Sequence, residues 1–138
     1  MAETQSPVDS PAIARPGSFT WGLVTFFAGW LVPGLGHALL RRWSRALVFC
    51  LSVAVLAATG LWLRGIVFGS HAADTFELLG FLADLGAGAL YPLARSLDVV
   101  ADVSRAGGDY GTRFFAAAGA LNLLCAFDAF AIATGRKP

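Results

Sequence analysis

Four long apolar stretches follow a polar N-terminal segment, and short polar connections separate them. They cover residues 19–40, 46–63, 75–97 and 112–134. A helix needs roughly 20 apolar residues to cross about 30 Å of hydrocarbon, so each stretch is long enough or nearly so. The pattern predicts an all-α membrane protein with four transmembrane helices arranged as two helical hairpins.

The third stretch fits this prediction less well than the other three. The second stretch, 46–63, has no ionisable group except Cys50, whereas 75–97 is interrupted by Glu77, Asp84 and Arg95. A charged side chain is costly at membrane depth. Three spans with a re-entrant third segment therefore remain an alternative.

The polar N-terminal segment, residues 1–18, contains Pro7, Pro11 and Pro16 among Ser, Gln, Glu and Asp. Such a composition cannot build a core, and it predicts a flexible tail. It also lacks the basic start of a signal peptide, because Arg15 is offset by Glu3 and Asp9. We therefore expect the first apolar stretch to be retained as an anchor, and residues 19–138 to form one transmembrane helical domain.

Composition supports the membrane assignment. The 138 residues are 57% hydrophobic and only 14% charged, against about 25% charged in ordinary soluble domains. The net charge of +1 provides no basic field for a phosphate backbone, so a nucleic-acid partner is not expected. The expected partners are the lipid bilayer and other membrane-protein subunits, with a homo-oligomer as a further possibility.

Arginines mark the turn between the first two stretches: Arg41, Arg42 and Arg45. Orientation follows the side richer in Lys and Arg. With four spans, six basic residues lie on one side (Arg41, Arg42, Arg45, Arg95, Arg105, Arg113) and four on the other (Arg15, Arg64, Arg136, Lys137). This bias predicts that both termini lie outside the cytoplasm.

The string Pro33-Gly34-Leu35-Gly36-His37 predicts a break in the first stretch. Proline removes a backbone donor and kinks or ends a helix, and the glycines permit an irregular backbone. The break is interpreted either as a kink with His37 at the headgroup level or as a polar site lined by His37. A narrower hypothesis makes His37 the ligand of a metal or of a tetrapyrrole pigment.

Four polar residues fall within the third and fourth stretches: Glu77, Asp84, Asn122 and Asp128. Glu77, Asp84 and Tyr91 are spaced by seven and so share one helical face. Asp84 is interpreted either as a proton or cation site or as a buried group bonded to Asn122 or to an arginine. Asn122 is expected to bond across helices, and Asp128 to pair with a cation near Arg136 and Lys137.

The two cysteines, Cys50 and Cys125, each lie inside an apolar stretch and are expected to behave as small hydrophobes. A disulfide between them would require their helices to pair at matching depth. No catalytic arrangement of Ser, His, Cys and Asp and no metalloprotease or hydrolase motif is present. We therefore do not expect an enzyme.

Two strings carry a resemblance to a known family. Residues 28–37, AGWLVPGLGH, with the following RRWSRAL at 41–47, resemble the WLVPGLGH start of a bacterial family of small multi-spanning membrane proteins of unknown function. The ending GALNLL at 119–124, followed by DAF at 128–130 and GRK at 135–137, is similar to the close of that family. The resemblance implies residence in a bacterial inner (cytoplasmic) membrane and brings no activity with it.

These observations lead to three expectations of function. The first is a non-catalytic accessory or scaffold subunit of a larger membrane complex, because a bundle this small has little interior left. The second is a small oligomeric channel or transporter in which Asp84 and Asn122 line a polar path. The third is a pigment-contacting subunit of a photosynthetic or respiratory complex, through His37.

Overall fold

The computed structural model describes residues 17–71, 73–97, 99–102 and 104–137, and all regular structure within them is helical. Six helices follow in order: α1 (Phe19–Leu31), α2 (Leu35–Leu39), α3 (Trp43–Trp62), α4 (Thr75–Leu85), α5 (Leu90–Ser96) and α6 (Ala106–Ala133). The prediction of an all-α fold is confirmed for this part of the chain. The predicted tail lies outside the described residues except for Gly17 and Ser18.

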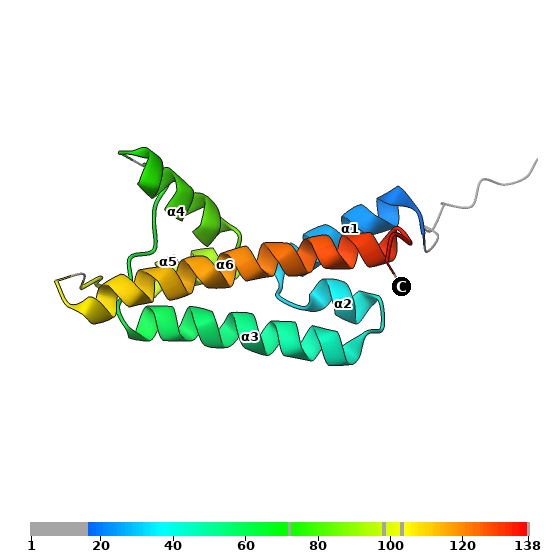
Figure 1. Cartoon of the computed structure of the whole chain (residues 1–138), viewed down its shortest axis with the longest axis horizontal. Coiled ribbons are helices and arrows are strands. Elements are labelled where there is room, and N and C mark those ends of the chain that lie inside the picture. Colours follow the sequence, from blue (N-terminus) through cyan, green and yellow to red (C-terminus); the bar gives the residue numbers. More distant parts are fainter. Residues whose placement is uncertain (1–16, 72, 98, 103, 138) are drawn as a thin grey trace, which may run out of the picture.

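Helices α3 and α6 form a long antiparallel pair (Figure 1). At one end Arg45 of α3 lies 3.7 Å from Asp128 of α6, and at the other Gly60 packs against the backbone of Gly111. With a rise of 1.5 Å per residue, α3 is about 30 Å long and α6 about 42 Å. Both are long and apolar enough to cross a membrane, as predicted for the second and fourth stretches.

Helix α6 begins at Ala106, six residues before the predicted start at 112. A Gly-Gly pair is typical of a turn, yet Gly107 and Gly108 both lie in the first turn of this helix. Asp109 favours the helix there because its negative charge faces the positive end of the helix dipole. Its carboxylate also pairs at 2.7 Å with Arg113, one turn later.

The first stretch, 19–40, is not the single span that was predicted. Helix α1 ends at Leu31 after 13 residues, and the five-residue helix α2 follows a break at Val32-Pro33-Gly34. Gly34 adopts φ +83°, a left-handed conformation that favours glycine. The chain therefore reverses, and Gly36 of α2 packs against Gly29 of α1.

The third stretch, 75–97, is also not a straight span. Helices α4 and α5 meet at 110° across a corner at residues 86–89, where Gly88 has φ +62°. The described residues thus contain two helices that can cross a membrane, or three spans if the bent pair counts as one, rather than a clear four.

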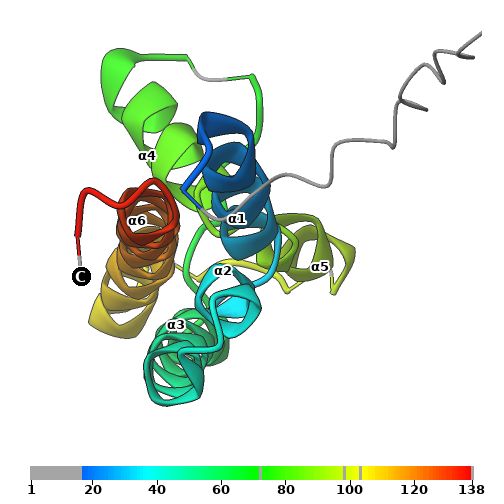
Figure 2. The same cartoon turned by 90° about the vertical axis from the view of Figure 1, so that its right-hand side faces the viewer.

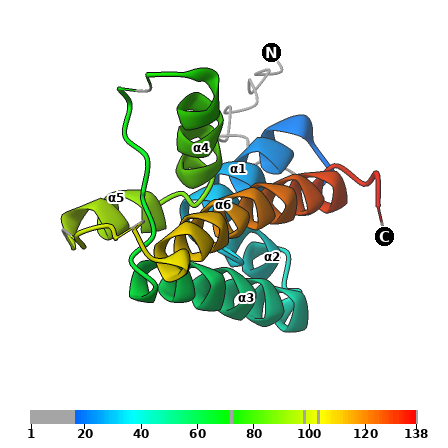
Figure 3. The ribbon, with the colours of Figure 1, turned by 60° about the vertical axis from the view of Figure 1, so that its left-hand side comes forward.

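The two broken stretches occupy opposite halves of the long pair. Along one half, α1 packs against α6 and α2 against α3 and α6, whereas near the other half α5 extends to the side of the pair (Figures 1 and 2). The N-terminal part of α4 stands away from the pair, while its C-terminal end contacts α6 (Figure 3). The core between these elements consists mainly of small side chains, which let helices pack closely: Val53, Ala57, Ala87, Ala94, Phe115 and Ala118.

Candidate functional site

Asn122 of α6 joins the two broken stretches in the middle of the protein. Its amide nitrogen donates hydrogen bonds to the carbonyl oxygen of Trp30 at 2.8 Å and to that of Gly86 at 2.9 Å. Trp30 belongs to the end of α1 and Gly86 caps α4. Because a helix leaves its last carbonyls without partners, one buried side chain here satisfies the ends of two helices.

The ends of α1 and α4 also contact each other directly. The indole N–H of Trp30 donates to the carbonyl of Leu85 at 3.2 Å, and the N–H of Ala89 donates to the carbonyl of Leu31 at 2.9 Å. A side chain at Gly88 would overlap the carbonyl oxygen of Trp30. We call this contact of residues 30–31, 85–89 and Asn122 the junction.

The junction lies close to the middle of the α3–α6 pair. Asn122 falls between Asp128, which marks one end of the pair, and Gly111, which marks the other. Next to it, Gly119 of α6 touches the backbone of α4, where an added Cβ would overlap the carbonyl oxygen of Ala83. Irregular backbone at this depth is tolerated when it is buried in protein and hydrogen-bonded, as it is here.

Asp84 is fully buried beside the junction, but its hydrogen bond goes to a loop. Its Oδ2 accepts the backbone N–H of Phe68 at 2.8 Å, and the Tyr91 hydroxyl donates to the carbonyl of Phe68 at 3.0 Å. Asp84 and Tyr91 therefore hold both backbone polar groups of one residue, Phe68, in the loop between α3 and α4. The spacing of seven residues indicated that Asp84 and Tyr91 lie on one side. Nothing in the sequence indicated that both would bond to Phe68.

The predicted hydrogen bond between Asp84 and Asn122 is not formed, because each side chain bonds to main chain instead. Among the described residues, Oδ1 of Asp84 and Oδ1 of Asn122 are both buried without a hydrogen-bond partner. Glu77 lies away from both. It accepts the N–H of Ala73 at 2.7 Å at the outer end of α4. The predicted face shared by Glu77, Asp84 and Tyr91 is not continuous, because the 110° corner separates Tyr91 on α5 from the other two on α4.

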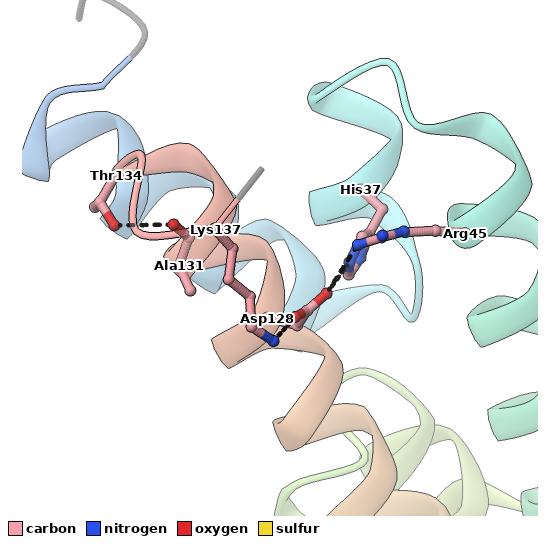
Figure 4. Close-up of polar contacts among 6 residues, drawn as sticks. All are labelled: His37, Arg45, Asp128, Ala131, Thr134 and Lys137. Carbon is pink, nitrogen blue, oxygen red and sulfur yellow. Dashed lines mark hydrogen bonds and ion pairs between the residues drawn. The ribbon is translucent and has the colours of Figure 1, made fainter.

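Asp128 contacts three basic side chains at one end of the α3–α6 pair (Figure 4). Its Oδ1 accepts Lys137 Nζ at 2.7 Å, while its Oδ2 lies 3.1 Å from His37 Nε2 and 3.7 Å from Arg45 Nη1. The expected pairing of Asp128 with a cation of the C-terminal segment is thus present. We call Asp128 with His37, Arg45 and Lys137 the acidic anchor.

The helix end explains how Lys137 reaches Asp128. Gly135 has φ +75°, and the N–H of Arg136 donates back to the carbonyl of Ala131 at 2.9 Å. This is the glycine-terminated helix end that reverses the chain. The sequence Gly135-Arg136-Lys137 therefore folds back along α6, with Lys137 beside Asp128.

The surroundings of His37 do not fit the ligand of a tetrapyrrole. The residue is 1% exposed, its ring contacts that of Phe49 in a tilted arrangement with 4.8 Å between centroids, and Nε2 faces Asp128. A pigment could reach Nε2 only by displacing the Asp128 carboxylate. Among the described residues, no cluster of three His, Cys, Asp or Glu is suited to hold a metal ion.

The structure corrects the predicted grouping of basic residues. Lys137 and Arg45 contact the same carboxylate, so the Arg41–Arg45 turn and the C-terminal segment lie at one end of the molecule. The four-span prediction placed them on opposite sides. Four complete spans do not fit this arrangement, because α3 and α6 run the length of the bundle whereas α4 and α5 are bent by 110°.

The fold so far defines an all-helical protein with two long apolar helices and two broken ones that meet at a buried asparagine. Residues 24–138 match a family described as a family of unknown function, DUF6677, and the chain belongs to this family. The match begins within α1 and includes the junction and the acidic anchor. No curated protein and no solved structure matches the chain.

Proposed function

We propose that this chain is a non-catalytic integral membrane protein and acts as an accessory or scaffold subunit of a larger complex in a bacterial inner membrane. One observation carries the proposal: Asn122, the polar side chain at the centre, donates both of its amide hydrogens to main-chain carbonyls. A residue used in this way closes the interior and fixes the helices. Asp84 likewise bonds to the main chain, and the acidic anchor joins α2, α3 and the C-terminal segment to α6 through side chains.

Helix α4 supplies the best candidate for a partner surface. Phe76, Leu79 and Leu82 follow one another at helical spacing and are 74%, 61% and 50% exposed. The helix is held mainly from its other faces, by Phe68 against Gly80 and by Gly119 against Ala83. An apolar helix that stands away from its own bundle offers more contact area to a neighbouring subunit than a helix packed within it.

Native mass spectrometry of the protein, extracted in mild detergent from its own membrane, tests this proposal. We expect a stoichiometric partner that is lost on Leu79→Ser. Leu47→Ser on α3 is the matched control, because Leu47 is also 61% exposed. A monomer without partner would contradict the proposal, and loss of the partner in both variants would remove α4 as its surface.

A small channel or transporter is the second candidate, and the junction favours it. Transporters place substrate and ion sites where broken helices meet near the middle of the bilayer. Here two broken stretches meet beside Asp84 and Asn122, each with a buried oxygen free of hydrogen bonds from the described residues. This candidate predicts proton or cation flux into liposomes that Asp84→Asn abolishes while the helical circular dichroism is retained; flux unaffected by the substitution would contradict it.

A further inference from the structure

An apolar groove runs along the outer side of α1 and α6 and ends at an arginine. Two cavities of about 390 and 480 Å³ adjoin there, and both are lined by Phe26 and Phe27 of α1. The first continues to Trp30 and to Gly86 at the junction. The second continues to Phe130 and to Arg136 beyond the end of α6.

The length of this groove matches one leaflet of a bilayer. Along α6 it extends from Leu123 to Ala131, about 12 Å at 1.5 Å per residue, before it reaches Arg136. Half of a hydrocarbon core about 30 Å thick is about 15 Å. The groove therefore leads from the surface where the acidic anchor lies to the middle of the bilayer.

Charge is confined to one end of the groove. Apart from the guanidinium of Arg136, the side chains that line both cavities are apolar, and Trp30 turns its only polar atom to Leu85. Lys137, Arg45 and His37 share the Asp128 carboxylate, whereas Arg136 forms no ion pair within the described part of the chain. A planar guanidinium matches a phosphate group through two parallel hydrogen bonds.

We propose that this groove binds an anionic glycerophospholipid, with an acyl chain against Phe26 and Phe27 and the headgroup phosphate on Arg136. The charge complementarity favours this occupant over a helix of a partner, since an apolar helix would leave the guanidinium without a counter-charge. The lipid comes from the leaflet at the end of the acidic anchor, where the guanidinium of Arg136 closes the groove. This proposal rests on the membrane placement proposed above and does not depend on the accessory role.

Trp30 provides the probe, because its indole lines the groove at membrane depth. The variant Trp21→Phe, Trp43→Phe, Trp62→Phe leaves it as the single tryptophan of the chain. The protein is reconstituted into phosphatidylcholine vesicles that contain a minority of lipid brominated in the middle of its acyl chains. Quenching of Trp30 fluorescence is compared between brominated phosphatidylglycerol and brominated phosphatidylcholine, after flotation has established insertion.

We expect phosphatidylglycerol to be enriched about fivefold over phosphatidylcholine next to Trp30, as judged from the quenching. This is the effect of one cation near an anionic lipid. In Arg136→Gln this preference disappears. It persists in the matched control Arg41→Gln, which removes a charge from the same end but not from the groove.

Three outcomes overturn the proposal. Equal quenching by the two lipids would mean ordinary lipid contact without a site, and equal loss of preference in both arginine variants would mean a diffuse basic surface. No quenching by either lipid in inserted protein would mean that protein, such as a second copy, covers the groove. Failure of flotation would instead reject the membrane placement itself, and with it the proposed function.

Discussion

At the scale of single residues, the polar groups inside this protein act on the backbone. Asn122 satisfies carbonyls at the ends of two helices, and Asp84 holds the N–H of a loop residue. Main-chain groups that lack partners are costly away from water, so a chain with two broken helices needs buried side chains of this kind. The hydrogen bonds of Asn122 and Asp84 therefore follow from the positions at which the helices end and leave main-chain groups without partners.

Replacement of Asn122 by leucine removes both hydrogen bonds at nearly constant volume. We expect the free energy of unfolding to fall by about 1–3 kcal/mol, because the carbonyls of Trp30 and Gly86 remain buried without donors. Titration with sodium dodecyl sulfate in mixed micelles, followed by circular dichroism, measures this loss. The control Leu124→Ala, at a residue 66% exposed on the same helix, should change stability by less than about 0.5 kcal/mol.

Asp102 lies in the polar connection between α5 and α6 and provides a prediction of pH dependence. The hydrogen bond from the Ser104 hydroxyl lowers the pKa of the Asp102 carboxyl below its ordinary value, and Arg105 at 3.6 Å acts in the same direction. A lowered pKa in the folded state means that this turn is stabilised above the ordinary pKa and loses that contribution as the pH falls through the folded pKa.

Ser104→Ala should therefore raise the pKa of Asp102 towards its ordinary value, as measured by carboxyl carbon NMR during an acid titration. Ser96→Ala is the control, because the Ser96 hydroxyl bonds to the carbonyl of Leu93. An Asp102 pKa that is the same in wild type and in Ser104→Ala would show that the hydroxyl does not cause the shift.

At the scale of elements, close backbone contact decides how the helices pair. Gly60 and Gly111 bring α3 and α6 together at one end, and Gly119 brings α4 onto the middle of α6. Packing in a lipid environment depends on such contacts, because apolar side chains gain little from leaving one apolar medium for another. The glycines of α6 therefore differ in how much they contribute to helix packing.

Gly119→Ala and Gly107→Ala separate a packing glycine from a free one within α6. A Cβ at Gly119 overlaps the carbonyl of Ala83, so we expect a loss of about 1–3 kcal/mol of stability and displacement of α4. A Cβ at Gly107 meets no atom within 4 Å, so alanine there should stabilise the helix by about 0.5–1 kcal/mol. The same detergent titration tests both variants, and equal effects would contradict the assigned contact.

At the scale of the whole molecule, the number of complete crossings decides which charges share a side. The described N-terminal residue Gly17 donates to Ala133 at 3.0 Å, so the start of α1 lies at the same end as the acidic anchor. Arg41, Arg42, Arg45, Arg136 and Lys137 thus gather at one end, whereas Arg64, Arg95, Arg105 and Arg113 lie toward the other. From this small excess of basic residues we expect the end with the acidic anchor to face the cytoplasm.

Labelling of single cysteines tests this orientation. In a background of Cys50→Ser and Cys125→Ala, a membrane-impermeant maleimide should label Arg42→Cys and Arg136→Cys from the cytoplasmic side. Asp109→Cys should be labelled from the opposite side. Labelling of Arg42→Cys and Arg136→Cys from opposite sides would restore four complete spans and contradict the packing described above.

Much of the fold could be predicted from the sequence alone. Uninterrupted apolar length determined α3 and most of α6, since a helix that satisfies its own backbone needs no distant partner to be recognised. Pro33 and Gly34 indicated the break after α1, because the missing donor and the left-handed conformation are local properties. Asp128 near Lys137 indicated an ion pair, since the two are close in sequence.

Only the tertiary structure showed which contacts the chain makes where its helices are broken. The distances along the chain between Asn122 and its partners Trp30 and Gly86 carry no periodic signal, so the junction could not be predicted from spacing. The corner at residues 86–89 likewise depends on contacts with distant parts of the chain. The amide of Asn122 donates to the carbonyl of Gly86, and the carbonyl of Leu31 accepts the N–H of Ala89. The apolar pattern therefore determined which segments are helical, and the need to satisfy the backbone where those helices end determined how they meet.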